Sequence, residues 1–86
     1  MLKEITKIDL LKEVQECINK DKELRGHVKL DLIDLDTGAD FNFLILSDKP
    51  FSWNIWDKVQ EVVYSCLEKY DPYITLHFEW EYVSGN

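Results

Sequence analysis

The residues best able to do chemistry are carboxylates in the middle of the chain, within the segment Leu35-Asp36-Thr37-Gly38-Ala39-Asp40. A carboxylate in a turn that follows an apolar run can share a proton with a second carboxylate and activate a water molecule. Alternating carboxylates around a glycine can instead surround a hard cation such as calcium. Acid–base hydrolysis and cation binding are therefore the two chemistries that this segment allows.

Asp36-Thr37-Gly38 resembles the active-site segment of the retroviral-type aspartic proteases. The resemblance implies a homodimer with Asp36 as the catalytic acid, and it extends over residues 35–40 alone. That family is almost wholly β and carries a later apolar run ending in Gly-Arg, whereas this chain has two strong helical patterns and no Gly-Arg pair. Asp, Thr and Gly are also ordinary hairpin residues, so we predict a turn without catalysis.

The spacing of possible metal ligands does not match a known site. An EF-hand loop starting at Asp34 would need Gly at its sixth position and Glu at its twelfth, where the chain has Ala39 and Ile45. A weaker cation site of another kind in this segment is the alternative. The cysteines and histidines form no CxxC or HxxxH motif, being far apart at Cys17, Cys66, His27 and His77. We predict no metal, no cofactor and two buried free thiols.

The first helical pattern extends from Thr6 to about Leu24, where apolar residues recur with the spacing of one helix face. Thr6 is the expected N-cap, with Asp9 completing a capping box, and Gly26 follows the C-terminal end. The alternative is a helix that starts after a cap at Asp9, with residues 2–8 extended.

The second helical pattern begins after Ser52, the expected N-cap. Phe51 is placed to pack against Trp56 as a hydrophobic staple. Asp71-Pro72 is expected to end this helix, because the residue before a proline disfavours the α region.

Three segments alternate apolar and polar residues, which is typical of half-buried strands. They are His27–Leu35, a segment around Phe41–Ile45, and Tyr73–Val83. A change of phase at Ile33 indicates a bulge or a segment covered on both faces, and residues 36–38 are expected to form the hairpin turn.

The predicted fold is a single α+β domain over residues 1–86 with the order α-β-β-α-β. We expect a two-layer sandwich with both helices on one face of a three-stranded antiparallel or mixed sheet. The helix between the second and third strands allows them to run parallel with the first strand between them, as in half of a ferredoxin-like fold.

The charge of the chain excludes several classes of function. Its 86 residues carry 17 acids and 10 bases, a net charge of −7, which argues against direct binding of nucleic acid. No apolar run approaches the length of a membrane span, so we expect a cytoplasmic protein. Residues 30–86 hold 3 bases and 11 acids, a net charge of −8 against +1 for residues 1–29. The acidic excess therefore belongs to the half that contains the sheet.

These observations predict a non-catalytic protein–protein interaction module that docks an acidic sheet or hairpin face on a basic partner surface. Inhibitors, antitoxins, immunity proteins and phage anti-defence proteins have this size and charge, and a nucleic-acid-binding enzyme that recognises carboxylates in place of DNA phosphates is one such partner. The alternative is a structural or regulatory domain that self-associates as a homodimer, through a sheet edge or through Leu44 and Leu46. The expected partner-binding residues are Asp31, Asp34, Asp36, Asp40, Tyr73, His77, Glu79 and Glu81. Among the aromatic residues, Trp53, Tyr64 and Tyr73 are expected to be free for a partner.

Overall fold

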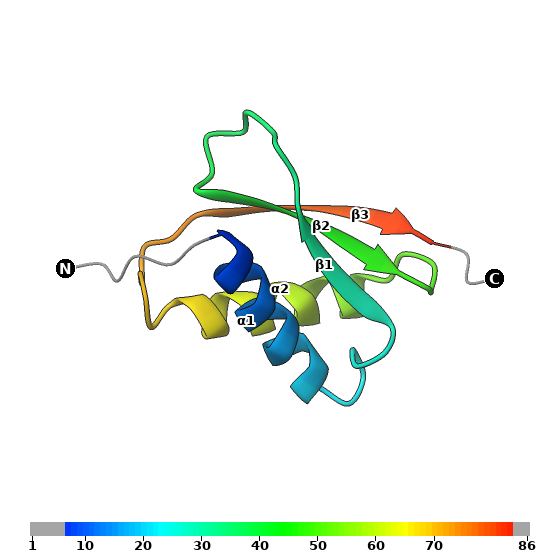
Figure 1. Cartoon of the computed structure of the whole chain (residues 1–86). Coiled ribbons are helices and arrows are strands. Elements are labelled where there is room, and N and C mark those ends of the chain that lie inside the picture. The colour runs from blue at the N-terminus through cyan, green and yellow to red at the C-terminus, as the bar shows by residue number, and fades with distance from the viewer. Residues whose placement is uncertain (1–6, 84–86) are drawn as a thin grey trace.

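The computed structural model describes residues 7–83 and contains two helices and one three-stranded mixed sheet. Both helices lie on the same face of the sheet, as Figure 1 shows. The predicted α+β class, the element order and the two-layer arrangement are therefore confirmed. No helix within residues 7–83 is long and apolar enough to cross a membrane. The elements are α1 (Lys7–Lys20), β1 (Val28–Leu32), β2 (Phe41–Ser47), α2 (Trp53–Leu67) and β3 (Leu76–Tyr82).

The sheet has the order β1-β2-β3, with β1 antiparallel and β3 parallel to β2. The prediction that the parallel strands would have the first strand between them is wrong, because β2 is the central strand. The chain places β1 on one side of β2 through a local connection. The chain then crosses over through α2 and adds β3 on the other side of β2. Two neighbouring parallel strands need such a crossover connection.

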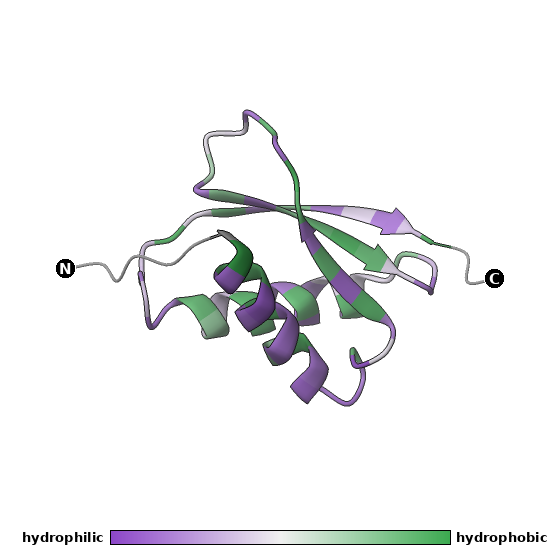
Figure 2. Ribbon diagram, in the orientation of Figure 1, coloured by the Kyte–Doolittle hydropathy of each residue, from purple (hydrophilic) through white to green (hydrophobic). Residues whose placement is uncertain are grey.

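The hydrophobic core lies between the sheet and the helices. Phe43 and Ile45 on β2 are fully buried and alternate with half-buried residues that face the other way. Figure 2 shows the complementary pattern on α1, whose outward side is hydrophilic. The helices contribute the remaining large part of the core through Leu10, Val14, Ile18, Val59, Val63 and Leu67.

Helix α1 starts at Lys7 and is therefore already helical before Asp9, so the alternative start at Asp9 is wrong. The expected cap at Thr6 lies outside the described residues. The helix ends at Lys20, earlier than predicted, because Asp21 Oδ1 accepts the backbone N–H of Glu23 at 2.8 Å and turns the chain. Leu24 is still buried in the core, although it lies in the turn after the helix and not on the helix itself.

Helix α2 begins after Ser52, which has extended backbone dihedrals but makes no side-chain cap bond. The expected staple is present, since the rings of Phe51 and Trp56 lie 5.7 Å apart. The helix ends at Leu67, before the predicted stop at Asp71-Pro72.

The connection between β1 and β2 is a loop over residues 33–40, longer than the predicted turn. Strand β1 ends at Leu32, so the change of phase at Ile33 marks the end of the strand and not a bulge within it. Gly38 in this loop has a φ of 80°, a conformation that suits glycine.

A disulfide joins Cys17 of α1 to Cys66 of α2, which corrects the prediction of two free thiols. Both residues lie on the apolar stripes of their helices, and the packing of the two stripes brings their Cα atoms to 6.4 Å. That separation is within the usual range for a disulfide. The bond ties together the two helices that form one layer of the fold.

Candidate functional site

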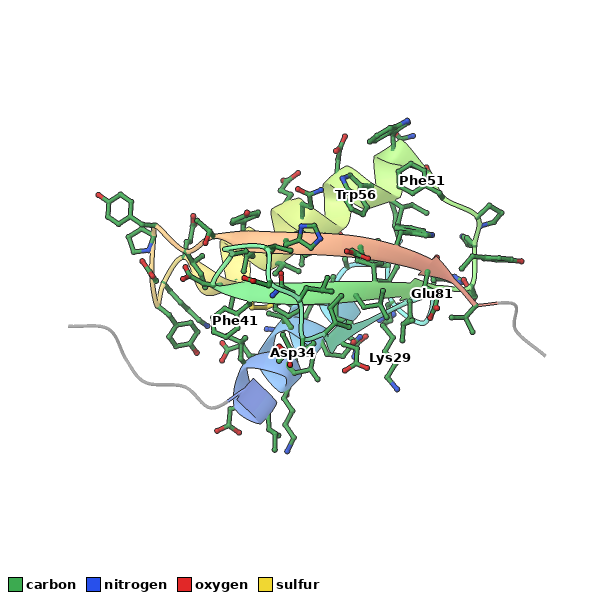
Figure 3. All side chains as sticks on the ribbon, turned by 90° about the horizontal axis from the view of Figure 1, so that it is seen from above. Lys29, Asp34, Phe41, Phe51, Trp56 and Glu81 are labelled. Atoms are coloured by element: carbon green, nitrogen blue, oxygen red, sulfur yellow. A yellow bond between two sulfur atoms is a disulfide. The ribbon has the colours of Figure 1, made fainter. Side chains whose placement is uncertain are left out.

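The face of the sheet opposite the helices carries the predicted carboxylates. The register places Leu44 between Asp31 and Glu79, and it places Leu46 between Lys29 and Glu81. We call this surface, made by Asp31, Leu44, Leu46, Glu79 and Glu81, the acidic face. In Figure 3 the labelled Lys29 and Glu81 lie on opposite sides of the central strand.

The acidic face has an apolar centre and a charged border. Leu44 and Leu46 are half-buried, whereas the three carboxylate residues are exposed. Interfaces commonly combine an apolar centre with a polar rim. With Lys29 as the neighbouring base, the three acids leave the surface negative, so it can attract a basic partner and exclude an acidic one.

His77 lies beside the acidic face, where the register pairs it with Asn42. Its Nε2 atom is 3.0 Å from Glu79 Oε2, and both side chains are partly exposed. The predicted grouping of Asp31, His77, Glu79 and Glu81 on one surface therefore agrees with the register.

The loop over residues 33–40 rises on the side of the sheet away from the helices (Figure 1). Asn42 holds it there, because its Nδ2 donates to the Leu35 carbonyl at 3.0 Å and its Oδ1 accepts the Thr37 hydroxyl. Asp34 and Asp36 are exposed on this loop. They extend the negative surface beyond the end of β1.

Asp40 has a structural task in addition to its charge. Its carboxylate accepts the Thr75 N–H at 3.0 Å, and its own N–H donates to the Thr75 hydroxyl at 3.0 Å. These bonds join the start of β2 to the chain that enters β3. Asp40 therefore differs from Asp34 and Asp36, whose carboxylates have no hydrogen bond or ion pair within residues 7–83.

Tyr73 is 87% exposed, as predicted, but it lies in the turn before β3. Its N–H donates to Asp71 Oδ1 at 3.0 Å. Within residues 7–83 no hydrogen bond connects it to the carboxylates of the acidic face. The structure thus brings the strand residues of the predicted site together and leaves Tyr73 at its margin.

A cluster of aromatic rings lies along the β3 side of the sheet, where Figure 3 labels Phe51 and Trp56. The Phe51 ring centroid is 5.0 Å from that of Trp53 and 5.3 Å from that of Trp80. Trp53 was expected to be free and is 71% exposed, whereas Phe51, which is 45% exposed, was not among the predicted partner residues. The sequence contained this signal. The staple position places Phe51 on the helix side of the sheet, and the alternation in β3 places Trp80 on the same side. We call Phe51, Trp53, Trp56 and Trp80 the aromatic cluster.

The protease and cation hypotheses gain no support from the geometry. Within residues 7–83 no group of three or more His, Cys, Asp or Glu side chains is arranged to hold a metal ion. The segment with Asp36 belongs to an α+β fold, unlike the β architecture that its resemblance implies.

An open groove of about 510 Å³ at the other end of the sheet is lined in part by His27 and Asp48, which form a surface pair at 3.1 Å.

Comparison of the chain with protein-family models, with curated proteins and with solved structures finds no match. The acidic face and its surroundings are therefore the features of this chain that bear on its function.

Proposed function

We propose that the protein is a non-catalytic interaction module that binds a basic surface of another protein through the acidic face. The observation that carries the proposal is the register of the sheet, which gathers Asp31, Glu79 and Glu81 around Leu44 and Leu46. Apolar groups at the centre supply contact area, and the surrounding carboxylates select a basic partner and speed its association. Asp34 and Asp36 on the adjoining loop extend the same charge.

Inhibition is the regulatory role that fits this chemistry best. A basic surface that binds nucleic acid offers Lys and Arg side chains spaced for phosphates, and carboxylates on a rigid sheet can occupy those side chains. The proposed partner is therefore a nucleic-acid-binding enzyme of the kind that immunity proteins, antitoxins and phage-encoded inhibitors oppose. The module would compete with nucleic acid and would not bind it.

The test uses the full chain as bait for partners from its native host. The triple variant Asp31→Lys, Glu79→Lys and Glu81→Lys reverses the acidic face. Its matched control makes the same change of charge at three exposed residues, Glu16 on α1, Asp57 on α2 and Glu68 directly after α2. The true partner is lost with the first variant and retained with the second. It is then purified, and its affinity is measured at low and high salt.

We expect reversal of the acidic face to weaken the purified complex by about tenfold or more, because several favourable charge pairs become repulsive. Salt should weaken the wild-type complex, since screening shortens the range of exposed charges. Nucleic acid should displace the module from the partner. Equal affinity for both triple variants, with no dependence on salt, would refute the proposal.

Self-association remains the alternative function. Stacking two acidic faces would bring the carboxylates of both copies together, which is unfavourable. Sedimentation at micromolar concentration distinguishes the two, since a stable dimer that buries Leu44 and Leu46 would contradict the proposed docking surface.

The cytoplasmic location stays a prediction. The Cys17–Cys66 disulfide argues for an oxidising compartment, because such bonds are rare in the reducing cytosol. Alkylation of free thiols in the native host, followed by intact mass, decides between the two locations.

A further inference from the structure

The two edges of the sheet are not equally protected. On β1, Gln15 of α1 donates to the Val28 carbonyl at 3.2 Å and accepts the Leu30 N–H at 2.8 Å. Those backbone groups point away from β2, so a side chain already occupies this edge. An additional strand could not bond to β1 there without displacing Gln15.

On β3, the corresponding protection by side chains within residues 7–83 covers the first residue alone. The Leu76 N–H donates to the Tyr64 hydroxyl at 3.3 Å, and that hydroxyl lies 3.4 Å from the Leu76 carbonyl. At the two ends of the β2–β3 pair, odd-numbered residues make the backbone bonds, since Phe41 N–H donates to Thr75 and Val83 N–H donates to Ser47. The backbone N–H and C=O groups of the even-numbered β3 residues therefore point away from β2, toward the outer edge of the sheet.

The outward N–H and C=O groups of Phe78, Trp80 and Tyr82 have no hydrogen-bond partner within residues 7–83. An unpaired strand edge is a template for another extended chain. Among residues 7–83, this stretch of β3 therefore has no hydrogen-bonding partner on its outer edge, in contrast to β1.

The two sides of this open edge differ in chemistry. On the outer side, Glu79 and Glu81 project next to each other along the strand. On the helix side, Trp80 continues into the aromatic cluster, and Tyr82 is 54% exposed. The indole N–H of Trp80 is buried without an acceptor among the described residues. A strand added here would place its side chains alternately beside carboxylates and beside aromatic rings.

We propose that the β3 edge from Phe78 to Tyr82 binds, as an added strand, an extended segment of the partner protein in which basic and apolar residues alternate. The inference rests on the proposed function, since it names the part of the basic partner that the module would hold. Residues opposite Glu79 and Glu81 would be Lys or Arg, and the residue opposite Trp80 would be apolar, because directly opposed residues share one face of a sheet. This pattern is the same for a parallel and an antiparallel strand.

Charge selects this occupant over a second copy of the chain. Pairing two β3 strands antiparallel about Trp80 would set Glu79 of each copy opposite Glu81 of the other, and parallel pairing in register would set like residues opposite each other. Like charges directly opposed across strands are destabilising. A basic segment turns the same two positions into favourable pairs.

The direct test titrates the full chain with an acetylated and amidated peptide of repeating Lys-Val sequence. Tryptophan fluorescence reports the contact, because the three tryptophans of the chain all lie in the aromatic cluster. One control peptide has its lysines and valines in two separate blocks, and another has Glu in place of Lys. A third carries N-methyl groups on the amides that face β3. Saturable binding of the first peptide alone is expected, with about tenfold or greater loss on N-methylation because two backbone bonds disappear.

A variant of the chain tests the same edge from the other side. Tyr82→Pro removes one outward N–H without changing the charge, and proline is tolerated at edge positions. Its control, Tyr82→Thr, removes the ring and keeps the N–H. We expect Tyr82→Pro to bind the alternating peptide about fivefold less tightly than Tyr82→Thr. Circular dichroism checks both folds, and if the proline variant unfolds, the N-methylated peptide carries the test.

The outcomes separate this inference from the proposed function. Equal binding of the alternating, blocked and N-methylated peptides would overturn strand addition, since charge attraction alone would explain it. Binding of the Glu-Val peptide, or a dimer that Tyr82→Pro dissociates, would overturn the basic occupant. Loss of the native partner on reversal of the acidic face, without any effect of Tyr82→Pro, would keep the proposed function and remove the edge inference.

Discussion

Reduction of the Cys17–Cys66 disulfide should destabilise the protein substantially. The bond closes a loop with a sequence separation of 49 residues. In the chain-entropy account, a cross-link of this span lowers the entropy of the unfolded chain and so raises its free energy by about 4 kcal/mol. Domains of this size are stable by about 5–15 kcal/mol in total, so the bond supplies a large share.

Urea unfolding followed by tryptophan fluorescence measures this effect with and without reductant. We expect the reduced protein to lose up to about 4 kcal/mol in its free energy of unfolding. Its melting temperature should fall by about 15 °C or more. The slope of the free energy against urea should also rise on reduction, because the unfolded chain without the cross-link exposes more surface.

The control is the double variant Cys17→Ala and Cys66→Ala, whose stability should be low and should not respond to reductant. Intact mass distinguishes the oxidised from the reduced chain in each sample. A wild-type protein that is oxidised by mass, yet loses less than about 1 kcal/mol on reduction, would refute the entropic reasoning.

Three further predictions concern the core, the β1 edge and the pH dependence. Phe43→Ala, at a fully buried position of the central strand, should cost about 3–5 kcal/mol in urea unfolding; a cost near zero would mean that the core is not packed as described. Gln15→Ala leaves the β1 edge groups unpaired and should cost about 1 kcal/mol, whereas Glu16→Ala, the exposed neighbour, should be neutral; equal effects would contradict the role of Gln15. The hydrogen bond to Glu13 raises the pKa of Tyr70 above its ordinary 10.0, so the stability from this pair is present below that pH and is lost as pH rises through the folded pKa. Ultraviolet titration should show one late tyrosine in the wild type and an earlier one in Glu13→Gln; a wild type without a late tyrosine would contradict the bond.

Much of the fold could be predicted because the signals are local. The spacing in α2 and the alternation in β3 depend on residues that are neighbours in sequence, and the alternation correctly put Glu79 and Glu81 on the face opposite Phe78 and Trp80. The exposure of Trp53 also followed from its place off the apolar stripe of α2. These patterns follow directly from the periods of helix and strand.

The errors concern contacts between residues far apart in the chain. Alternation shows which side of a strand is buried but not which strands are neighbours, so the central position of β2 was missed. The helical stripes predicted that Cys17 and Cys66 would be in the core, but not that two helices would bring them together. The protection of one edge by Gln15 also depends on packing between α1 and β1, which no local pattern in the sequence shows.

The bonds between Asp40 and Thr75 determine more than the local geometry of two loops. A slip of β3 by one residue against β2 would turn Glu79 and Glu81 into the core and Trp80 into solvent, because the side-chain period of a strand is two. Asp40 and Thr75 fix the alignment at the point where the parallel strands begin, through bonds made in both directions. An exposed polar contact at the rim of the sheet thus reinforces the register that the alternation of apolar and charged residues in β3 already favours.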